Sequence, residues 1–158
     1  MARQKITTFL WFDKEAEEAA NFYVALFPDS AVTKVTPGPD GSFLVVEFRL
    51  AGQDYIALNG GPHFKFTEAI SLSIDCGTQT EVDRYWEALS AGGSTSQCGW
   101  VKDKYGLSWQ VVPGVLLDLL ADADRAKAGR AMAAMMTMTK LDIRALRAAA
   151  DAELLTVR

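Results

Sequence analysis

The sequence repeats one pattern of secondary structure between residues 6 and 113, and this repeat restricts the possible folds more than any other feature. Each copy begins with an apolar, β-prone run, continues as a helix-like segment, and ends in β-prone runs with a glycine at a turn, Gly52 or Gly106. The two helical segments are alike: residues 22–26 read FYVAL and residues 85–89 read YWEAL. Two βαβββ modules fit this stretch, so we expect an α+β fold.

The expected helices begin at residues that are typical of helix N-termini. Asp13 follows the first β-prone run, at residues 6–11, and precedes several glutamates, so we predict that it caps the first helix. Residues 78–81 read TQTE, which is the capping-box pattern, and we predict a helix from there to about residue 91.

Alternation predicts which strand residues share a face. Ile70, Leu72 and Ile74 should pack under the second helix, with Ala69, Ser71 and Ser73 on the opposite face. Residues 98–113 read as a hairpin with a charged turn that ends at Gly106. In its second strand we expect Trp109 in the core and Gln110, with Ser108, on the other side.

Composition indicates a globular protein that can build a core, because 49% of the 158 residues are hydrophobic and 23% are charged. The net charge of −4 and the lack of long charged runs predict neither a nucleic-acid partner nor an anionic membrane. We expect no signal peptide, and no apolar stretch of the sequence is long enough to span a bilayer. Cys76 and Cys98 have no metal-site spacing, so we expect free thiols and a cytoplasmic protein.

The chain divides into a domain at residues 1–114, with modules at about 5–60 and 68–114, and a helical extension at residues 115–158. The extension carries Met132, Met135 and Met136 at helical spacing. A methionine-rich face favours an adaptable packing surface or a dimer contact over a cofactor site.

Several motifs resemble a known family. They are LWFD at residues 10–13, AANFY at 19–23, LNGGP at 58–62, and the hairpin from CGW at 98–100 to WQVVP at 109–113. These motifs resemble the vicinal oxygen chelate superfamily, which includes glyoxalase I, bleomycin-resistance proteins and extradiol dioxygenases. Within it the chain is similar to the bacterial PhnB-like group, labelled "3-demethylubiquinone-9 3-methyltransferase domain". The resemblance implies a curved mixed sheet around a pocket, helices on the outer face, and a homodimer.

The same resemblance locates the positions that hold a metal ion in chelating relatives. They fall on Ile6, Ala57, Ala69 and Gln110, and only Gln110 can coordinate a cation. A catalytic metal needs about three protein ligands and an open position. The nearest polar neighbours are Thr7, Thr8, Asn59 and Glu68, of which only Glu68 is a strong ligand. We therefore predict no bound metal and no cofactor.

The preferred hypothesis is a metal-free protein that binds a small molecule in a pocket lined by aromatic side chains. The predicted pocket residues are Thr8, Leu10, Asn59, Phe64, Phe66, Ser71, Trp100 and Gln110. His63, the only histidine, and Cys98 are possible reactive groups, and no residue is assigned a catalytic role. The alternatives are a metal-dependent glyoxalase- or dioxygenase-type enzyme, a methyltransferase, and a dimeric scaffold. The methyltransferase is disfavoured because Gly60-Gly61 and Gly92-Gly93 do not form the expected strand–glycine–helix turn.

Overall fold

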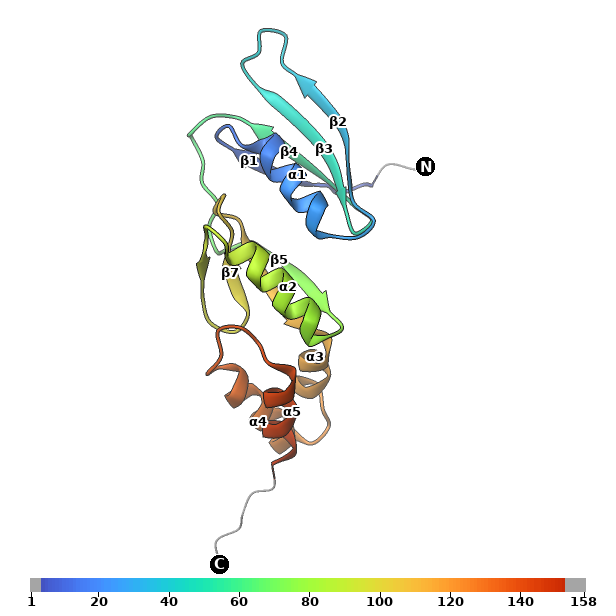
Figure 1. Cartoon of the computed structure of the whole chain (residues 1–158), viewed down its shortest axis with the longest axis vertical. Helices are drawn as coiled ribbons and strands as arrows, with labels where there is room; N and C mark the ends of the chain where they lie inside the picture. The colour runs from blue at the N-terminus through green and yellow to red at the C-terminus, as the bar shows by residue number, and fades with distance from the viewer. Residues whose placement is uncertain (1–3, 153–158) are drawn as a thin grey trace, which may run out of the picture. The chain divides into compact units, whose positions relative to one another are not determined.

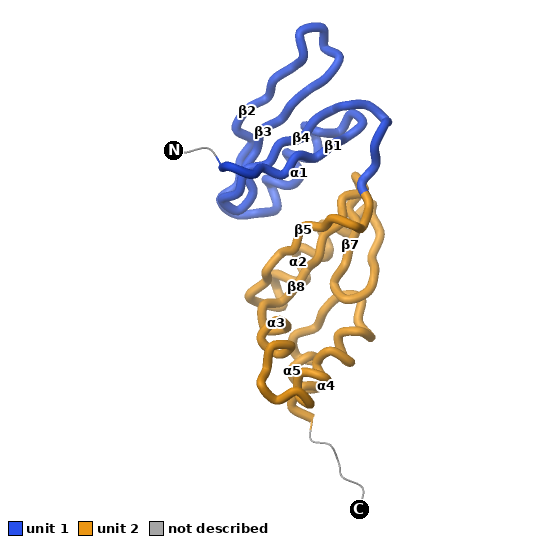
Figure 2. The backbone as a smooth tube through the Cα atoms, turned by 180° about the vertical axis from the view of Figure 1, so that it is seen from behind, with its two compact units in different colours: residues 1–66 blue, residues 67–158 orange. Residues whose placement is uncertain are grey.

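The computed structural model describes residues 4–152 and divides the chain into two compact units. Unit 1 ends at Phe66 and unit 2 begins at Thr67, as Figure 2 shows by colour. Each unit holds one βαβββ module with a four-stranded mixed sheet, so the predicted α+β fold and the repeat are confirmed. Among residues 4–152, no helix is long and apolar enough to cross a membrane.

Unit 1 is a four-stranded sheet with a single helix packed on it (Figure 1). Its elements are β1 (Thr8–Phe12), α1 (Ala16–Leu26), β2 (Ala31–Pro37), β3 (Leu44–Leu50) and β4 (Gln53–Asn59). The strand order is β1-β4-β3-β2, in which β1 is parallel to β4 and the other neighbours are antiparallel. The helix is the crossover between β1 and the later strands, as parallel pairing requires.

The core of unit 1 lies between α1 and one face of this sheet. Tyr23 of α1 stacks on Phe48 of β3, with their ring centroids 6.4 Å apart, and both side chains are buried. Leu10 and Ala57 are register partners on the same face and are also buried. Because side chains alternate along a strand, Phe9 lies on the opposite face, where it is 55% exposed.

The start of α1 differs from the prediction that Asp13 caps it. Asp13 is exposed, and the N-cap position belongs to Glu15, which makes no side-chain capping bond. The side chain of Asn59 instead supplies the acceptor: its Oδ1 receives the backbone N–H of Ala16 at 2.7 Å. The first N–H groups of a helix have no partner within the helix. Asn59, at the end of β4, supplies an acceptor for one of them, as the side chain of an N-cap residue usually does.

Unit 2 repeats this topology. Its module contains β5 (Ser71–Cys76), α2 (Gln79–Ser90), β6 (Ser94–Thr95), β7 (Trp100–Lys102) and β8 (Ser108–Pro113), in the sheet order β5-β8-β7-β6. Strands β5 and β8 are parallel, and α2 packs against β5, β7 and β8. The predicted capping box is confirmed at its first bond, since the Thr78 hydroxyl accepts the N–H of Glu81 at 3.2 Å.

The hairpin of β7 and β8 is organised by a buried carboxylate. Trp109 is 2% exposed, as predicted, and its indole Nε1 donates to Oδ2 of Asp103 at 2.9 Å. Oδ1 of Asp103 accepts the backbone N–H groups of Tyr105 and Leu107 at 2.9 and 3.1 Å. Asp103 is 3% exposed, so the turn that reads as charged contains a buried anchor.

The prediction that Ile70 packs under the second helix is wrong. Ile70 precedes β5 and is 72% exposed, whereas Ile74 is buried and Leu72 is half-buried. The alternation is correct, but the strand begins one residue after Ile70, so that side chain has no helix above it.

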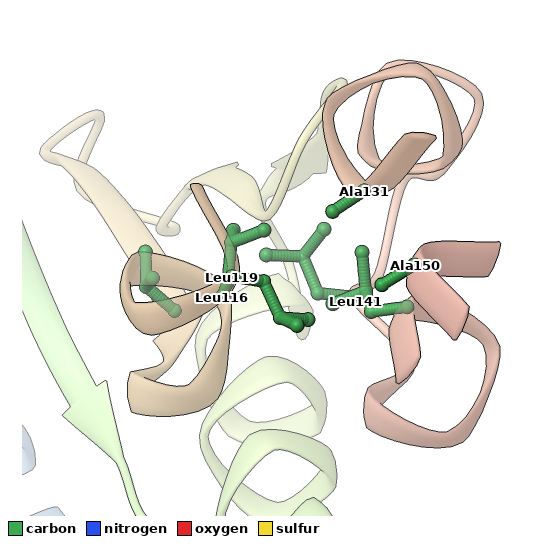
Figure 3. Packing of buried hydrophobic residues seen from close by; sticks show 7 residues of the cluster. Leu116, Leu119, Ala131, Leu141 and Ala150 are labelled. Atoms are coloured by element: carbon green, nitrogen blue, oxygen red, sulfur yellow. The ribbon is translucent and has the colours of Figure 1, made fainter. Parts of the chain in front are cut away.

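Residues 114–151 form three helices that belong to the same compact unit as the second module. They are α3 (Gly114–Leu120), α4 (Arg125–Met135) and α5 (Ile143–Asp151). Figure 3 shows their shared apolar cluster, which consists of Val112, Leu116, Leu119, Ala131, Leu141, Leu146 and Ala150. A separate domain boundary at residue 114 stays a prediction.

Hydrogen bonds also attach the extension to the module. Gln79 at the start of α2 donates to the carbonyl of Leu141 at 3.1 Å and accepts the N–H of Ile143 at 2.9 Å. The backbone N–H of Cys98 donates to the carbonyl of Met138 at 2.8 Å. The extension is therefore fixed to the helix and to the segment that enters the last hairpin.

Candidate functional site

The candidate site is the face of the unit 2 sheet that lies opposite α2, which we call the open face. Trp109 and Val111 of β8 are buried on the α2 side, so alternation places Gln110 on the open face. Trp100 of β7 is the register partner of Gln110. The Gln110 amide also donates to the Ser71 hydroxyl at 3.0 Å. The structure thus brings together three residues of the predicted pocket.

One cavity of about 550 Å³ lies beside β6 and β7. We call it the Ser108 cavity. It is lined by Glu68, Ser94, Thr95, Ser96, Gln97, Cys98, Trp100, Val101, Lys102 and Ser108. Ser108 is only 2% exposed, and its hydroxyl has no hydrogen-bond partner within residues 4–152. A buried hydroxyl without a partner is unusual, because leaving it unsatisfied costs about 1–3 kcal/mol.

The charged residues of the Ser108 cavity pair with each other. The Lys102 ammonium donates to the Glu68 carboxylate, and this hydrogen bond lowers the pKa of Glu68. Both side chains are partly exposed, so the pair contributes little to stability. Because the charges of Lys102 and Glu68 offset each other, the cavity favours a ligand that is recognised by polar contacts and stacking.

A second cavity, of about 280 Å³, lies where the helical extension meets the open face. We call it the extension cavity. Its lining residues are Ser73, Asp75, Cys98, Trp100, Gln110, Val112, Leu116, Leu117, Leu120 and Met135. The sheet supplies the polar wall, and α3 and α4 supply the apolar one. Cys98 and Trp100 line both cavities.

Three predicted pocket residues of unit 1 lie on or beside its first strand. Leu10 is 5% exposed and belongs to the core under α1. Asn59 is half-buried, and its carbonyl oxygen is occupied by the N-terminus of α1. Thr8 is exposed at the first position of β1. In unit 1 Leu10 therefore serves the core and Asn59 the start of the helix, whereas Thr8 has neither role.

The aromatic loop after β4 folds back onto β1 within unit 1. The ring of Phe64 lies edge-on to Trp11, with 4.9 Å between centroids, and Phe66 meets Phe12 in the same way at 5.2 Å. Phe64 is 66% exposed. His63, between Pro62 and Phe64, is also exposed.

The two cysteines occupy different environments. Cys76 is buried, and burial raises the pKa of its thiol to about 12, so it stays protonated at neutral pH. Cys98 is half-buried, and its Sγ lies 3.7 Å from the sulfur of Met136. Cys98 also adopts a positive φ of 58°, which is uncommon for a residue with a Cβ.

The residues at the four metal positions do not fit a chelated cation. The assignment of Ala57 to a metal position that faces the pocket is wrong, because Ala57 is fully buried on the α1 side of the sheet with its register partner Leu10. The side chains of Ile6 and Ala69 offer no donor atom, and Gln110, whose amide nitrogen donates to Ser71, could supply only one oxygen. Within residues 4–152, no three His, Cys, Asp or Glu side chains are grouped as a metal ion would need.

Sequence reasoning missed the wall that the extension contributes. Leu116, Leu117 and Leu120 fall within the predicted helical extension, and nothing in their spacing says which strand they meet. Asp75 could have been found, since it continues the alternation of Ala69, Ser71 and Ser73 by one more step.

Comparison with solved structures agrees with this architecture. Glyoxalase I from Leishmania major is 14% identical, with a TM-score of 0.53, and the match covers 81% of this chain and 99% of that one. The fosfomycin-resistance protein FosX from Listeria monocytogenes, solved with Mn(II) and sulfate, is 17% identical, with a TM-score of 0.53 and coverage of 69% and 90%. These two likenesses show that the chain shares the fold of paired βαβββ modules with those proteins.

Sequence comparison then gives the family. A PhnB protein from Bacillus cereus is 33% identical with a TM-score of 0.66, and the match covers 70% of this chain and all of that one. The family model described as 3-demethylubiquinone-9 3-methyltransferase matches residues 4–112. The chain belongs to this PhnB-like family. No protein among the curated sequences matches it.

Proposed function

We propose that this protein binds a small molecule on the open face of its second module without a metal ion. The observation that carries the proposal is the position of Trp100, which lines both cavities while its register partner Gln110 lies beside it. A flat apolar ring next to an amide is a common way to stack a planar ligand and fix its orientation.

The fixed orientation of Gln110 supports the same proposal. The Gln110 amide is held by Ser71, so its orientation is set before a ligand arrives. Preorganised polar groups lose less entropy on binding and therefore give better affinity.

Metal-dependent chemistry is the less favoured alternative. FosX was solved with Mn(II), but across residues 4–152 of this chain no three His, Cys, Asp or Glu side chains are grouped as a metal ion would need. Methyl transfer, which the family description suggests, also lacks support from the residues. The chain runs from β1 into α1 through Asp13, Lys14 and Glu15, without the glycine-rich turn of the common S-adenosylmethionine enzymes.

The test is a screen of aromatic fragments, monitored by two-dimensional ¹⁵N–¹H NMR of the full chain. The four tryptophan indoles give separate reporters, and Trp100→Phe assigns the signal of Trp100. We expect hits to shift that signal, and we expect Trp100→Ala to weaken their binding at least fivefold. Trp86→Ala, on a half-buried position of α2, is the control. Hits that respond equally to both variants would refute the proposal.

A further inference from the structure

The extension cavity has a single formal charge on its wall. Among its lining residues only Asp75 is charged, and no lysine, arginine or histidine borders it. Within residues 4–152, the Asp75 carboxylate accepts no hydrogen bond and belongs to no ion pair. In the Ser108 cavity, by contrast, the carboxylate of Glu68 is paired with Lys102. Asp75 is therefore available to a ligand.

A glycine keeps this carboxylate uncovered. Gly114, the first residue of α3, faces Asp75 so closely that an added Cβ would lie 2.9 Å from Oδ1. Any other side chain at this position would crowd the oxygen. The open approach to Asp75 is thus built into the junction between β8 and the extension.

The opposite wall is apolar and comes from the extension. Leu116, Leu117 and Leu120 project from α3, and Met135 projects from α4. Leu117 is 58% exposed, so its side chain is accessible to a ligand in the cavity. The family model ends at residue 112, so these four side chains all lie beyond the part of the chain that it matches.

We propose that the extension cavity binds an organic cation with an apolar body, such as a primary amine on a short alkyl or aryl group. This inference rests on the proposed binding function and adds the charge of the ligand. The ammonium pairs with Asp75, the body contacts the leucines and Met135, and the Trp100 ring provides a further cation–π surface. A carboxylate of the same size is repelled by Asp75 and finds no cation on the wall.

Three probes of equal carbon number test the charge preference: hexylamine, hexan-1-ol and hexanoate. Each is titrated at pH 7 into the full chain, and the Trp100 indole signal is followed by NMR. We expect hexylamine to bind about two- to fivefold more tightly than hexanol, the range of a solvent-accessible ion pair, and hexanoate to bind most weakly. Added salt should reduce the advantage of hexylamine.

Variants of the protein distinguish the contribution of the Asp75 charge from that of the apolar wall. Asp75→Asn should bring hexylamine to the affinity of hexanol and leave hexanol unchanged. Asp118→Asn, an exposed carboxylate on α3 that does not line the cavity, is the matched control and should change neither. Leu117→Ser should weaken all three probes, and because Leu117 is exposed the fold should survive.

The outcomes distinguish this inference from the function on which it rests. Equal affinities for hexylamine and hexanol, or an unchanged hexylamine affinity in Asp75→Asn, would overturn the cation preference alone. If none of these probes moves the Trp100 signal while aromatic fragments do, the extension cavity is not the binding place and the inference also fails. If no compound of either set moves it, the proposed function fails with it.

Discussion

Asp103 should be one of the most sensitive positions in unit 2, because its carboxylate closes the last hairpin from inside. In Asp103→Asn, the remaining Oδ1 can still accept the N–H groups of Tyr105 and Leu107. The new amide NH₂, however, replaces the oxygen that receives the Trp109 indole N–H, so two donors then meet. The loss of one charge-assisted bond costs about 1.5–3 kcal/mol, and the buried indole left without an acceptor adds to this. We expect a loss of about 3 kcal/mol.

Urea unfolding followed by tryptophan fluorescence measures this loss, since three of the four tryptophans lie in unit 2. With a slope of about 2 kcal/mol per molar urea, the midpoint should fall by about 1.5 M. Asp40→Asn is the control, because Asp40 also accepts a backbone N–H two residues on, from Ser42, but in an exposed turn. Its midpoint should hardly change. A shift for Asp103→Asn no larger than that of Asp40→Asn would refute the role of the buried carboxylate.

Three further changes test other parts of the structure. Asn59→Ala removes the acceptor for the first N–H of α1 and should destabilise unit 1 by about 1 kcal/mol in urea unfolding, whereas Asn21→Ala, exposed on α1, should not. Gln79→Ala breaks two hydrogen bonds around the start of α5, at Leu141 and Ile143, and should lower the free energy of unfolding by about 1–2 kcal/mol. Thr80→Ala, at an exposed position, is the control, and equal losses in both variants would contradict the attachment of the extension to α2. Burial raises the pKa of Cys76 from 9.0 to about 12, so the unfolded thiol loses its proton first and stability should fall as pH rises above about 9. Urea midpoints at pH 8 and 10 should show a smaller fall in Cys76→Ala than in the parent chain, and identical slopes would disprove this contribution.

Much of the fold can be predicted from the sequence because its signals are local. Alternation in the last hairpin places Trp109 in the core and Gln110 on the other face, and the TQTE pattern marks the start of α2. The cap of α1 could not be predicted, since its acceptor comes from Asn59, 43 residues away from Ala16. Asp103 could not be recognised as buried, because a charged residue in a turn is usually solvated.

The candidate site was predictable only where it follows strand parity. Ser71, Trp100 and Gln110 meet because register and alternation bring them to one face of one sheet. The apolar wall of the extension cavity depends on how α3 turns back after β8, and no periodicity within α3 reports its partner. For Leu10 the predicted face is wrong: the sequence predicts that it lines the pocket, but it is buried on the side of the sheet that faces α1.

Ligand affinity measured before and after removal of metal ions tests the central claim most directly. The protein is purified without chelator, its metal content is determined, and one aromatic fragment that shifts the Trp100 signal is titrated before and after dialysis against EDTA. We predict substoichiometric metal and the same affinity in both samples, because in the part of the chain that the structure describes no three His, Cys, Asp or Glu side chains are grouped as a metal ion would need. Stoichiometric metal together with loss of binding after dialysis would contradict metal-free binding on the open face.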